Sequence, residues 1–165
     1  MKAHKFDIRN LGGLNNPKRL EILDIQKICN HFNLQKDMTL VDIGTGTGIF
    51  AEAFLNLLPE AKCYALDIKQ EMIDWIKDNR EAYKNGKLIP LVMEESKTPL
   101  DDSIADFVFM ITLHHELDEP VELMKECRRI LRHGGKLLIA DWTKDATDGP
   151  PKHHRVEPSL VISHL

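Results

Sequence analysis

Apolar and polar positions along the chain fall into blocks that predict strands and helices in alternation. Short apolar runs, which are typical of β-strands, occupy residues 40–43, 62–67, 88–92, 105–111 and 136–140. Apolar residues at helical spacing predict helices over residues 17–33, from the glycine-rich loop to near Pro59, over 69–83 and over 118–132. Strands that alternate with helices form parallel βαβ units with right-handed crossovers. We therefore predict an α/β fold, a Rossmann-like, doubly wound, mainly parallel sheet flanked by helices.

The first predicted helix follows a polar segment. Residues 1–16 predict an irregular lead-in, at whose end Asn16 can cap a helix with Pro17 in its first position. We expect this helix, residues 17–33, to pack across the sheet edge or over a ligand site.

Three further features refine the predicted elements. Pro90 places the strand 88–92 at a sheet edge, because proline cannot donate to a strand ladder. The continuous apolar run 105–111 is typical of a strand buried on both faces, near the sheet centre. In the last predicted helix we expect Asp118 to be the cap and residues 133–135 to be the end.

Length and composition indicate one domain, residues 1–165. We divide it into a lead-in and helix (1–35), a ligand-binding core (36–145) and a tail (146–165). The net charge of −4 does not favour binding to nucleic acid or to an acidic membrane. The sequence has three scattered cysteines and no apolar run of membrane-spanning length, so we expect reduced, buried thiols, no membrane partner and a cytoplasmic location.

The stretch 39–54 carries the strongest chemical signal. An apolar strand meets three alternate glycines, Gly44, Gly46 and Gly48, and a helical pattern follows. Glycine permits a positive φ and a close approach of ligand to backbone, and the helix beyond offers unpaired N–H groups. The loop closes one residue earlier than the dinucleotide fingerprint, since Ile49 stands where its third glycine would be. The alternative interpretation is simple turn chemistry.

Acidic residues follow two other strands. Asp67 ends the second strand, where a carboxylate can accept both ribose hydroxyls of a nucleoside; alternatively it caps the next helix. Glu94 and Glu95 follow the third strand, where an acid can accept a hydrogen bond from an adenine amino group; alternatively they form a solvated turn.

The string Asp-x-Gly-x-Gly-x-Gly at residues 42–48 resembles the first motif of class I S-adenosylmethionine-dependent methyltransferases. Residues 129–137 resemble the helix-to-strand turn Arg-Val-Leu-Lys-Pro-Gly-Gly of that family, with His133 in place of the proline. The resemblance runs from about residue 6 to about residue 158 and is to the small-molecule branch, which includes quinone-biosynthesis methyltransferases. It implies S-adenosylmethionine as cofactor and S-adenosylhomocysteine as product.

In that family the glycine loop holds the methionine part, the acid after strand two the ribose, and the acid after strand three the adenine. The cofactor-binding residues implied for this chain are Asp42, Gly44, Thr45, Gly46, Thr47, Gly48, Asp67, Ile68, Glu94, Glu95, Ile111 and Thr112.

The methyl acceptor is expected at the carboxyl ends of the fourth and fifth strands. A sulfonium methyl is already activated, so alignment and exclusion of water can supply much of the catalysis. If the nucleophile needs a base, His115 is the candidate; alternatively it packs or caps at a helix start. Arg155 could orient an acidic acceptor or lie in a solvated loop. The residues at this mouth are Thr112, His114, His115, Glu116, Asp141 and Trp142.

No His-x3-His or His-Glu-x-x-His spacing occurs on a predicted helix, so no metal site is predicted.

Class I methyltransferases normally continue past strand five through a helix and a hairpin of strands six and seven, and this sequence does not supply them. A truncated form, a natural short form and a sheet completed by a partner subunit are the three explanations. An uncovered fifth strand could pair two copies into a homodimer.

Methyl transfer to a small-molecule acceptor is the leading hypothesis, with the acceptor and its reacting atom undefined. A cofactor-binding module without turnover is the second. A nicotinamide-dependent oxidoreductase is the third, because Asp67 suits it although the glycine spacing does not.

Overall fold

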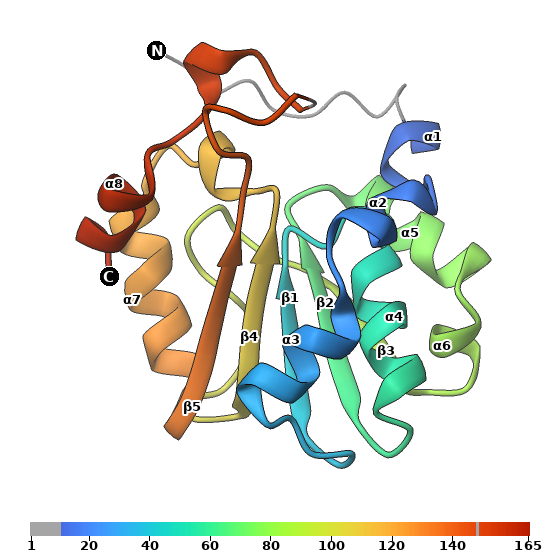
Figure 1. The fold of residues 1–165 in the computed structure, drawn as a ribbon. Helices are drawn as coiled ribbons and strands as arrows, with labels where there is room; N and C mark the ends of the chain where they lie inside the picture. Colours follow the sequence, from blue (N-terminus) through green and yellow to red (C-terminus); the bar gives the residue numbers. More distant parts are fainter. Residues whose placement is uncertain (1–10, 148) are drawn as a thin grey trace.

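The computed structural model describes residues 11–147 and 149–165, and the predicted lead-in at residues 1–10 lies outside them. The sheet has five strands, all parallel, in the order β3-β2-β1-β4-β5 (Figure 1). This confirms the predicted α/β, Rossmann-like fold. The strands are β1 (Thr39–Ile43), β2 (Lys62–Asp67), β3 (Leu88–Val92), β4 (Ala105–Ile111) and β5 (Leu131–Ala140).

Helices cover both faces of this sheet. Buried residues of α3, α4, α5 and α6 belong to the cluster on one face, and buried residues of α7 belong to the cluster on the other. The helices are α1 (Leu11–Leu14), α2 (Lys18–Ile22), α3 (Ile25–Phe32), α4 (Ile49–Leu57), α5 (Gln70–Asn79), α6 (Glu81–Lys84), α7 (Pro120–Ile130) and α8 (Pro158–Ser163). The chain passes over the carboxyl ends of β4 and β5 before it reaches α8 (Figure 1), and Val161 and Ile162 of α8 line a cavity together with residues of β5.

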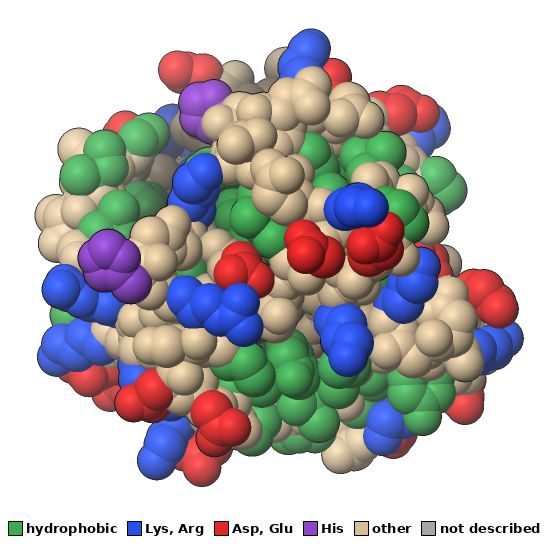
Figure 2. Space-filling view, turned by 90° about the horizontal axis from the view of Figure 1, so that it is seen from below, with side chains coloured by type: hydrophobic (Ala, Val, Ile, Leu, Met, Phe, Trp, Pro, Cys, Tyr) green, Lys and Arg blue, Asp and Glu red, His purple; other side chains and the backbone are tan. Residues whose placement is uncertain are grey.

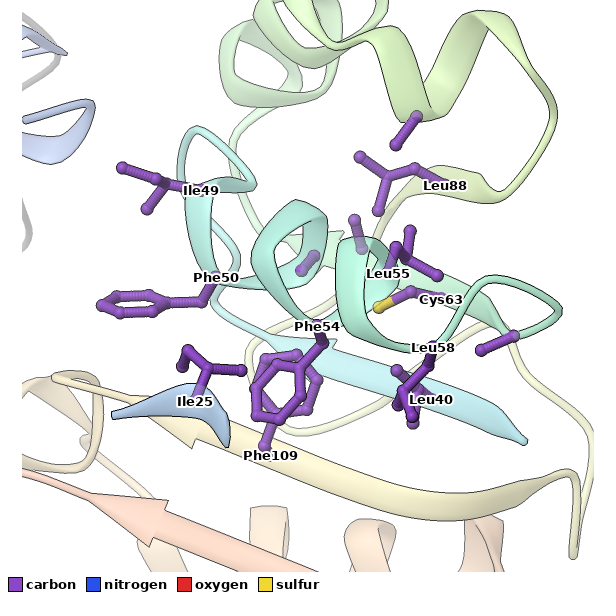
Figure 3. Close-up of a cluster of buried hydrophobic side chains, with 14 of the residues drawn as sticks. Ile25, Leu40, Ile49, Phe50, Phe54, Leu55, Leu58, Cys63, Leu88 and Phe109 are labelled. Carbon is purple, nitrogen blue, oxygen red and sulfur yellow. The ribbon is translucent and has the colours of Figure 1, made fainter. Parts of the chain in front are cut away.

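The alternating side chains of β4 join the two halves of the core. Phe107 and Phe109 belong to the cluster under α3 and α4, whereas Val108 and Met110 belong to the cluster under α7. Phe54 of α4 packs on the ring of Phe109 with the ring centroids 4.7 Å apart (Figure 3). A strand with both faces buried is what the continuous apolar run predicted.

The helix predicted over residues 17–33 is two helices. Leu23 is extended between them, and the Asp24 side chain caps α3 by accepting a hydrogen bond from the Lys27 N–H. An aspartate that caps a new helix ends the preceding one, because its backbone is not helical. The predicted cap is one residue off: α2 begins at Lys18 with Pro17 as its cap residue and no side-chain cap bond, although Asn16 accepts a hydrogen bond from the Lys18 N–H. The predicted irregular lead-in is wrong over α1, which forms one helical turn.

Two other helix boundaries differ from prediction. The helix predicted over residues 69–83 breaks at Arg80, whose ψ of 124° is extended. Instead of Asp118, Glu119 stands at the cap of α7 and makes no side-chain hydrogen bond there, while Pro120 takes the first turn. The same helix ends at Ile130 and β5 begins at once, so the turn predicted at residues 133–135 lies within the strand, beside an irregularity in its pairing with β4.

Both edge strands of the sheet are the ones that the sequence predicted. β3, which contains Pro90, is one edge, and β5 is the other. Pairing of two copies through β5 stays a prediction. The three cysteines are free and buried, as expected.

The end of the molecule at which the strands begin carries charges of both signs, interspersed, together with a hydrophobic patch (Figure 2). No helix of the described chain is both long enough and apolar enough to cross a membrane.

Candidate functional site

A cavity opens at the carboxyl ends of β1, β2 and β4, at the end of the molecule opposite to the one that Figure 2 shows. Between β1 and β4 the strand order reverses, and open α/β sheets bind ligands at such a switch point. We call this space the first cavity. Its walls come from the glycine loop, the ends of the three strands, the segments after β3 and β4, the end of α1 and one residue of α2. They include Leu14, Asp42, Gly44, Asp67, Met93 and Thr112.

The glycine loop has a conformation that only glycine adopts without strain. Gly44 has a φ of +69° and Gly46 a φ of +54°. A Cβ added at Gly44 would lie 2.7 Å from the side chain of Leu113, which shows how closely the loop after β4 approaches. The sequence pattern is therefore more than turn chemistry, because backbone and neighbour both require glycine at position 44.

Asp67 ties the end of β2 to the glycine loop. Its Oδ2 accepts a hydrogen bond of 2.9 Å from the Gly46 N–H, and its Oδ1 accepts one of 3.0 Å from the Lys69 N–H. The second bond precedes α5, whose cap residue is Lys69 and has no side-chain cap bond, so Asp67 does not cap that helix as the alternative interpretation had it. A carboxylate has about four acceptor positions, so both oxygens keep capacity for ligand hydroxyls.

Asp42 lies at the bottom of the first cavity and is only 3% exposed. Burial raises its pKa to about 8, although the Thr45 hydroxyl opposes that shift by donating a hydrogen bond of 2.7 Å to Oδ2. Burial also raises the pKa of Asp67. The site therefore contains two carboxyl groups that a positively charged ligand would stabilise in their ionised forms.

Four acidic side chains line the first cavity, against two basic ones. The acids are Asp42, Asp67, Glu95 and Glu116, and the bases are Arg19 and Lys69. This balance favours a ligand with more positive than negative groups.

Most of the residues implied by the resemblance line this cavity, and three do not. Thr47 and Gly48 face the other side of the loop, where Arg80 donates to the Thr47 carbonyl and a Cβ at Gly48 would meet Ile76. Glu94 is exposed, and its backbone forms an isolated antiparallel β-bridge with Lys97. The lining residues among those predicted are Asp42, Gly44, Thr45, Gly46, Asp67, Ile68, Glu95, Ile111 and Thr112.

A second cavity adjoins the first and shares Arg19, Phe50, Ile111 and Thr112 with it. Its other walls are apolar except for Asp141 and come from α2 and the end of β5, with Ile22, Leu23, Ala140 and Trp142. Two contiguous cavities at the carboxyl ends of the strands could hold two reactants side by side.

His115 lies behind Asp141 and lines neither of these two cavities. Its Nδ1 is 2.7 Å from Oδ1 of Asp141, and its Nε2 is 3.7 Å from Oε1 of Glu116. Burial alone would lower the pKa of His115, but Asp141 and Glu116 together raise it above the ordinary value. Paired in this way, Nδ1 carries the proton toward Asp141 and Nε2 is the basic nitrogen.

His114, predicted at the mouth, and Arg155, predicted to orient an acceptor or to lie in a solvated loop, both have structural contacts. His114 is buried and its ring stacks on His164, with centroids 5.3 Å apart. Arg155 is buried and donates to the backbone carbonyls of Pro150, Thr143 and Ala146, which holds the tail together. In the described part of the chain, no group of three or more histidine, cysteine or acidic side chains could hold a metal ion.

Two arginines of the site were not predicted from the sequence. Arg19 lines both cavities from α2, and Arg80 holds the back of the glycine loop from the break between α5 and α6. Arg19 shares its short helix with Ile22, which also lines the second cavity, and this was only a weak signal. Nothing local distinguishes Arg80 from the exposed charges around it.

Comparisons with known proteins give a consistent result. A family model described as a methyltransferase domain matches residues 41–139. A malonyl-[acyl-carrier protein] O-methyltransferase of Methylococcus capsulatus is 31% identical over 103 residues, 62% of this chain and 37% of that protein. A ubiquinone/menaquinone biosynthesis C-methyltransferase of Bordetella avium is 30% identical over 124 residues, 73% of this chain and 47% of that protein. The chain thus spans between a third and a half of the length of these curated relatives.

One solved structure matches nearly the whole chain. It is a SAM-dependent methyltransferase from Aquifex aeolicus, 32% identical, with a TM-score of 0.89, and the match covers 97% of this chain and 86% of that one. A putative sarcosine dimethylglycine methyltransferase from Galdieria sulphuraria shares the fold at 18% identity, with a TM-score of 0.65 over 71% of this chain and 44% of that one.

Proposed function

Because this chain belongs to the S-adenosylmethionine-dependent methyltransferases, we propose that it transfers the methyl group of S-adenosylmethionine to a small-molecule acceptor. The observation that carries this proposal is the first cavity, where the glycine loop, Asp67 and three other acids surround one space at the switch point of the sheet.

The residues of the first cavity fit this cofactor. Its methionine part carries an ammonium and a sulfonium group, which suit a space lined by four acids and two bases. We assign the ribose hydroxyls to Asp67, whose oxygens keep acceptor capacity beside their two backbone bonds. For the adenine we assign the Glu95 side of the wall, since Glu94 does not line the cavity.

When bound, S-adenosylmethionine supplies a methyl group on a positively charged sulfur, which is activated for attack by a nucleophile. The work left to this chain is alignment of the two reactants and exclusion of water. Phe50, Ile111 and Thr112 stand where the two cavities meet, so they would border the reacting groups.

We also propose His115 as the base for acceptors that are protonated at neutral pH. The Asp141 carboxylate orients its ring and raises its basicity, as in other carboxylate–histidine pairs. Because His115 lines neither cavity, an acceptor proton would have to reach Nε2 on the side of Glu116, which lines the first cavity and lies 3.7 Å from that nitrogen.

Isothermal titration with S-adenosylhomocysteine tests the cofactor site. We expect the wild-type chain to bind at micromolar strength and Asp67→Asn to bind at least about tenfold more weakly, because hydrogen bonds to a charged group contribute about 1.5–3 kcal/mol. Asp78→Asn, the same substitution at an exposed position of α5, is the matched control and should bind as wild type does.

Absence of binding by the folded wild-type chain would overturn this proposal. Binding without methyl transfer to any acceptor of a broad panel would favour the alternative of a cofactor-binding module.

A further inference from the structure

Arg19 is a half-buried cation whose guanidinium is bound only by neutral groups. Its Nη1 donates to the Leu14 carbonyl at 3.1 Å, and its Nη2 donates to Oγ1 of Thr112 at 2.8 Å. The guanidinium carbon lies 4.9 Å from the centroid of the Phe50 ring. Among residues 11–147 and 149–165, no carboxylate forms an ion pair with it. Asp42 favours the charged guanidinium only by longer-range electrostatics, and a buried charge without an ion-pair partner is costly, so an anion is the natural ligand here.

The partner of Arg19 at the end of β4 is held in an unusual conformation. Thr112 has a φ of +57°, which is rare for a β-branched residue. Its N–H donates to the Ala140 carbonyl at 2.7 Å, so the neighbouring strand holds the backbone in place. Strain of this kind persists where the surrounding structure enforces it, and it is concentrated at ligand sites. At this site it directs the Thr112 hydroxyl to Arg19.

The second cavity indicates what the anion is attached to. Apart from Arg19 and Asp141, its charged groups, the cavity is walled mainly by the aromatic rings of Phe50 and Trp142 and by aliphatic side chains. The oxygens of Asp141 already accept from the His115 ring, the His115 N–H and the Trp142 N–H. Arg19 retains N–H groups that no described atom accepts, because a guanidinium has five.

We propose that the second cavity is the acceptor subsite and that Arg19 selects acceptors that are flat, largely apolar molecules with an anionic oxygen group. This inference rests on the methyltransferase activity proposed above, because it places the acceptor beside the cofactor cavity. The competing ligand for Arg19 is the carboxylate of the cofactor's methionine part, which would lie in the first cavity. If Arg19 binds the acceptor, a change at Arg19 lowers the affinity for the acceptor. If it binds the cofactor carboxylate, the same change lowers the affinity for the cofactor.

Tryptophan fluorescence can measure occupation of this subsite directly. Trp142 lines the second cavity, and the other tryptophan, Trp75, is replaced by phenylalanine to leave a single reporter. The probes are benzoate and benzamide, which have nearly the same shape and differ in charge. Each is titrated with and without saturating S-adenosylhomocysteine, into the reporter protein and into the same protein with Arg19→Gln or Arg128→Gln. Arg128 is exposed on α7, so its variant is the control for loss of one arginine.

We expect benzoate to bind the reporter protein about tenfold more tightly than benzamide. Arg19→Gln should abolish this preference and weaken benzoate binding by a larger factor than S-adenosylhomocysteine binding, whereas Arg128→Gln should change neither. Equal binding of the two probes, or quenching by neither, would overturn the proposal. So would an Arg19→Gln protein that loses S-adenosylhomocysteine affinity and keeps the benzoate preference, since Arg19 would then serve the cofactor. If the wild-type chain fails to bind S-adenosylhomocysteine, the activity proposal fails, and the probe titrations without it still decide the role of Arg19.

Discussion

The hydroxyl of Thr45 donates a hydrogen bond of 2.7 Å to Oδ2 of Asp42, beneath the first cavity. One hydroxyl does not replace the hydration of a carboxylate that is 3% exposed, so the pKa of Asp42 remains raised, at about 8. At neutral pH Asp42 therefore keeps its proton in the folded protein and loses it in the unfolded chain.

This difference predicts that the protein without ligand becomes less stable as the pH rises from about 4 to about 8. The folded state binds more protons than the unfolded state in that window, and such a state loses stability as protons become scarce. Asp42→Asn removes the titrating carboxyl group. Between pH 5 and pH 9 the melting temperature of this variant should therefore fall by at least about 3 °C less than that of the wild type. Thermal unfolding across this range checks the prediction. Parallel curves for the two proteins would contradict it.

Glu126 predicts the opposite behaviour in acid. Its Oε1 accepts hydrogen bonds from the N–H and the hydroxyl of Thr98, and Arg129 donates to both of its oxygens. The Arg129 bonds are the main reason why the pKa of Glu126 is lowered to about 2. A lowered pKa contributes stability above the ordinary value of 4.5, and this contribution is lost as the pH falls toward 2.

Glu126→Gln should therefore lower the free energy of unfolding by about 1–3 kcal/mol at pH 7 and by less at pH 3. Chemical denaturation at the two pH values measures this difference. Glu122→Gln, on an exposed part of α7, is the control. An equal loss at both pH values would mean that the charge of Glu126 is unimportant.

The strands and the cofactor wall were predictable because their signals are local. Glycine at positions 44 and 46 favours a positive φ, and the apolar run that contains Phe107 and Phe109 predicts a buried strand. The helix breaks at Asp24 and Arg80 were not predictable in the same way. Aspartate and arginine also occur inside helices, and the contacts that these two side chains make determine whether the helix ends there. The wall formed by Arg19 depends on pairing across 93 residues, and no local pattern encodes such a pairing.

Gly44→Ala should abolish binding of S-adenosylhomocysteine with a modest loss of stability. Alanine would have to adopt a φ of +69°, and its Cβ would lie 2.7 Å from the Leu113 side chain, so the glycine loop or that side chain must move. Isothermal titration and thermal unfolding measure the two effects. Gly86→Ala is the control, because its φ of +77° is equally strained but nothing lies within 4 Å of an added Cβ. Retained affinity in Gly44→Ala would show that the close approach of Leu113 is dispensable.

The pair of His115 and Asp141 predicts a histidine that titrates above its ordinary pKa of 6.5. Asp141→Asn should lower the pKa of His115, because the hydrogen bond at 2.7 Å and the negative charge both favour the protonated ring. The chemical shift of the imidazole Cε1 proton, assigned by its absence in His115→Gln, follows the titration. A pKa that is the same in wild type and Asp141→Asn would remove the physical basis for a His115 base.

Arg80 makes the last prediction, because it holds the glycine loop from outside the cavity. Its Nε donates to the Thr47 carbonyl at 2.7 Å, its Nη1 to Oε2 of Glu52 at 2.8 Å, and its Nη2 to Oδ1 of Asn15. These bonds join α4, the glycine loop and the turn before α2. Arg80→Gln keeps a donor and loses the charge and the fork of bonds, so the loop should sample more conformations and bind less tightly.

We expect Arg80→Gln to weaken S-adenosylhomocysteine binding about tenfold, which corresponds to the loss of one hydrogen bond to a charged group. Arg80→Lys should lie between the variant and wild type, and the exposed Arg128→Gln should match wild type. Titrations are run well below each melting temperature, so that the folded fraction does not change the affinity. A lower melting temperature with unchanged affinity would make Arg80 a purely stabilising residue. A lower affinity in the folded variant would make it a positioning residue for the glycine loop, since it lies outside the lining of the first cavity.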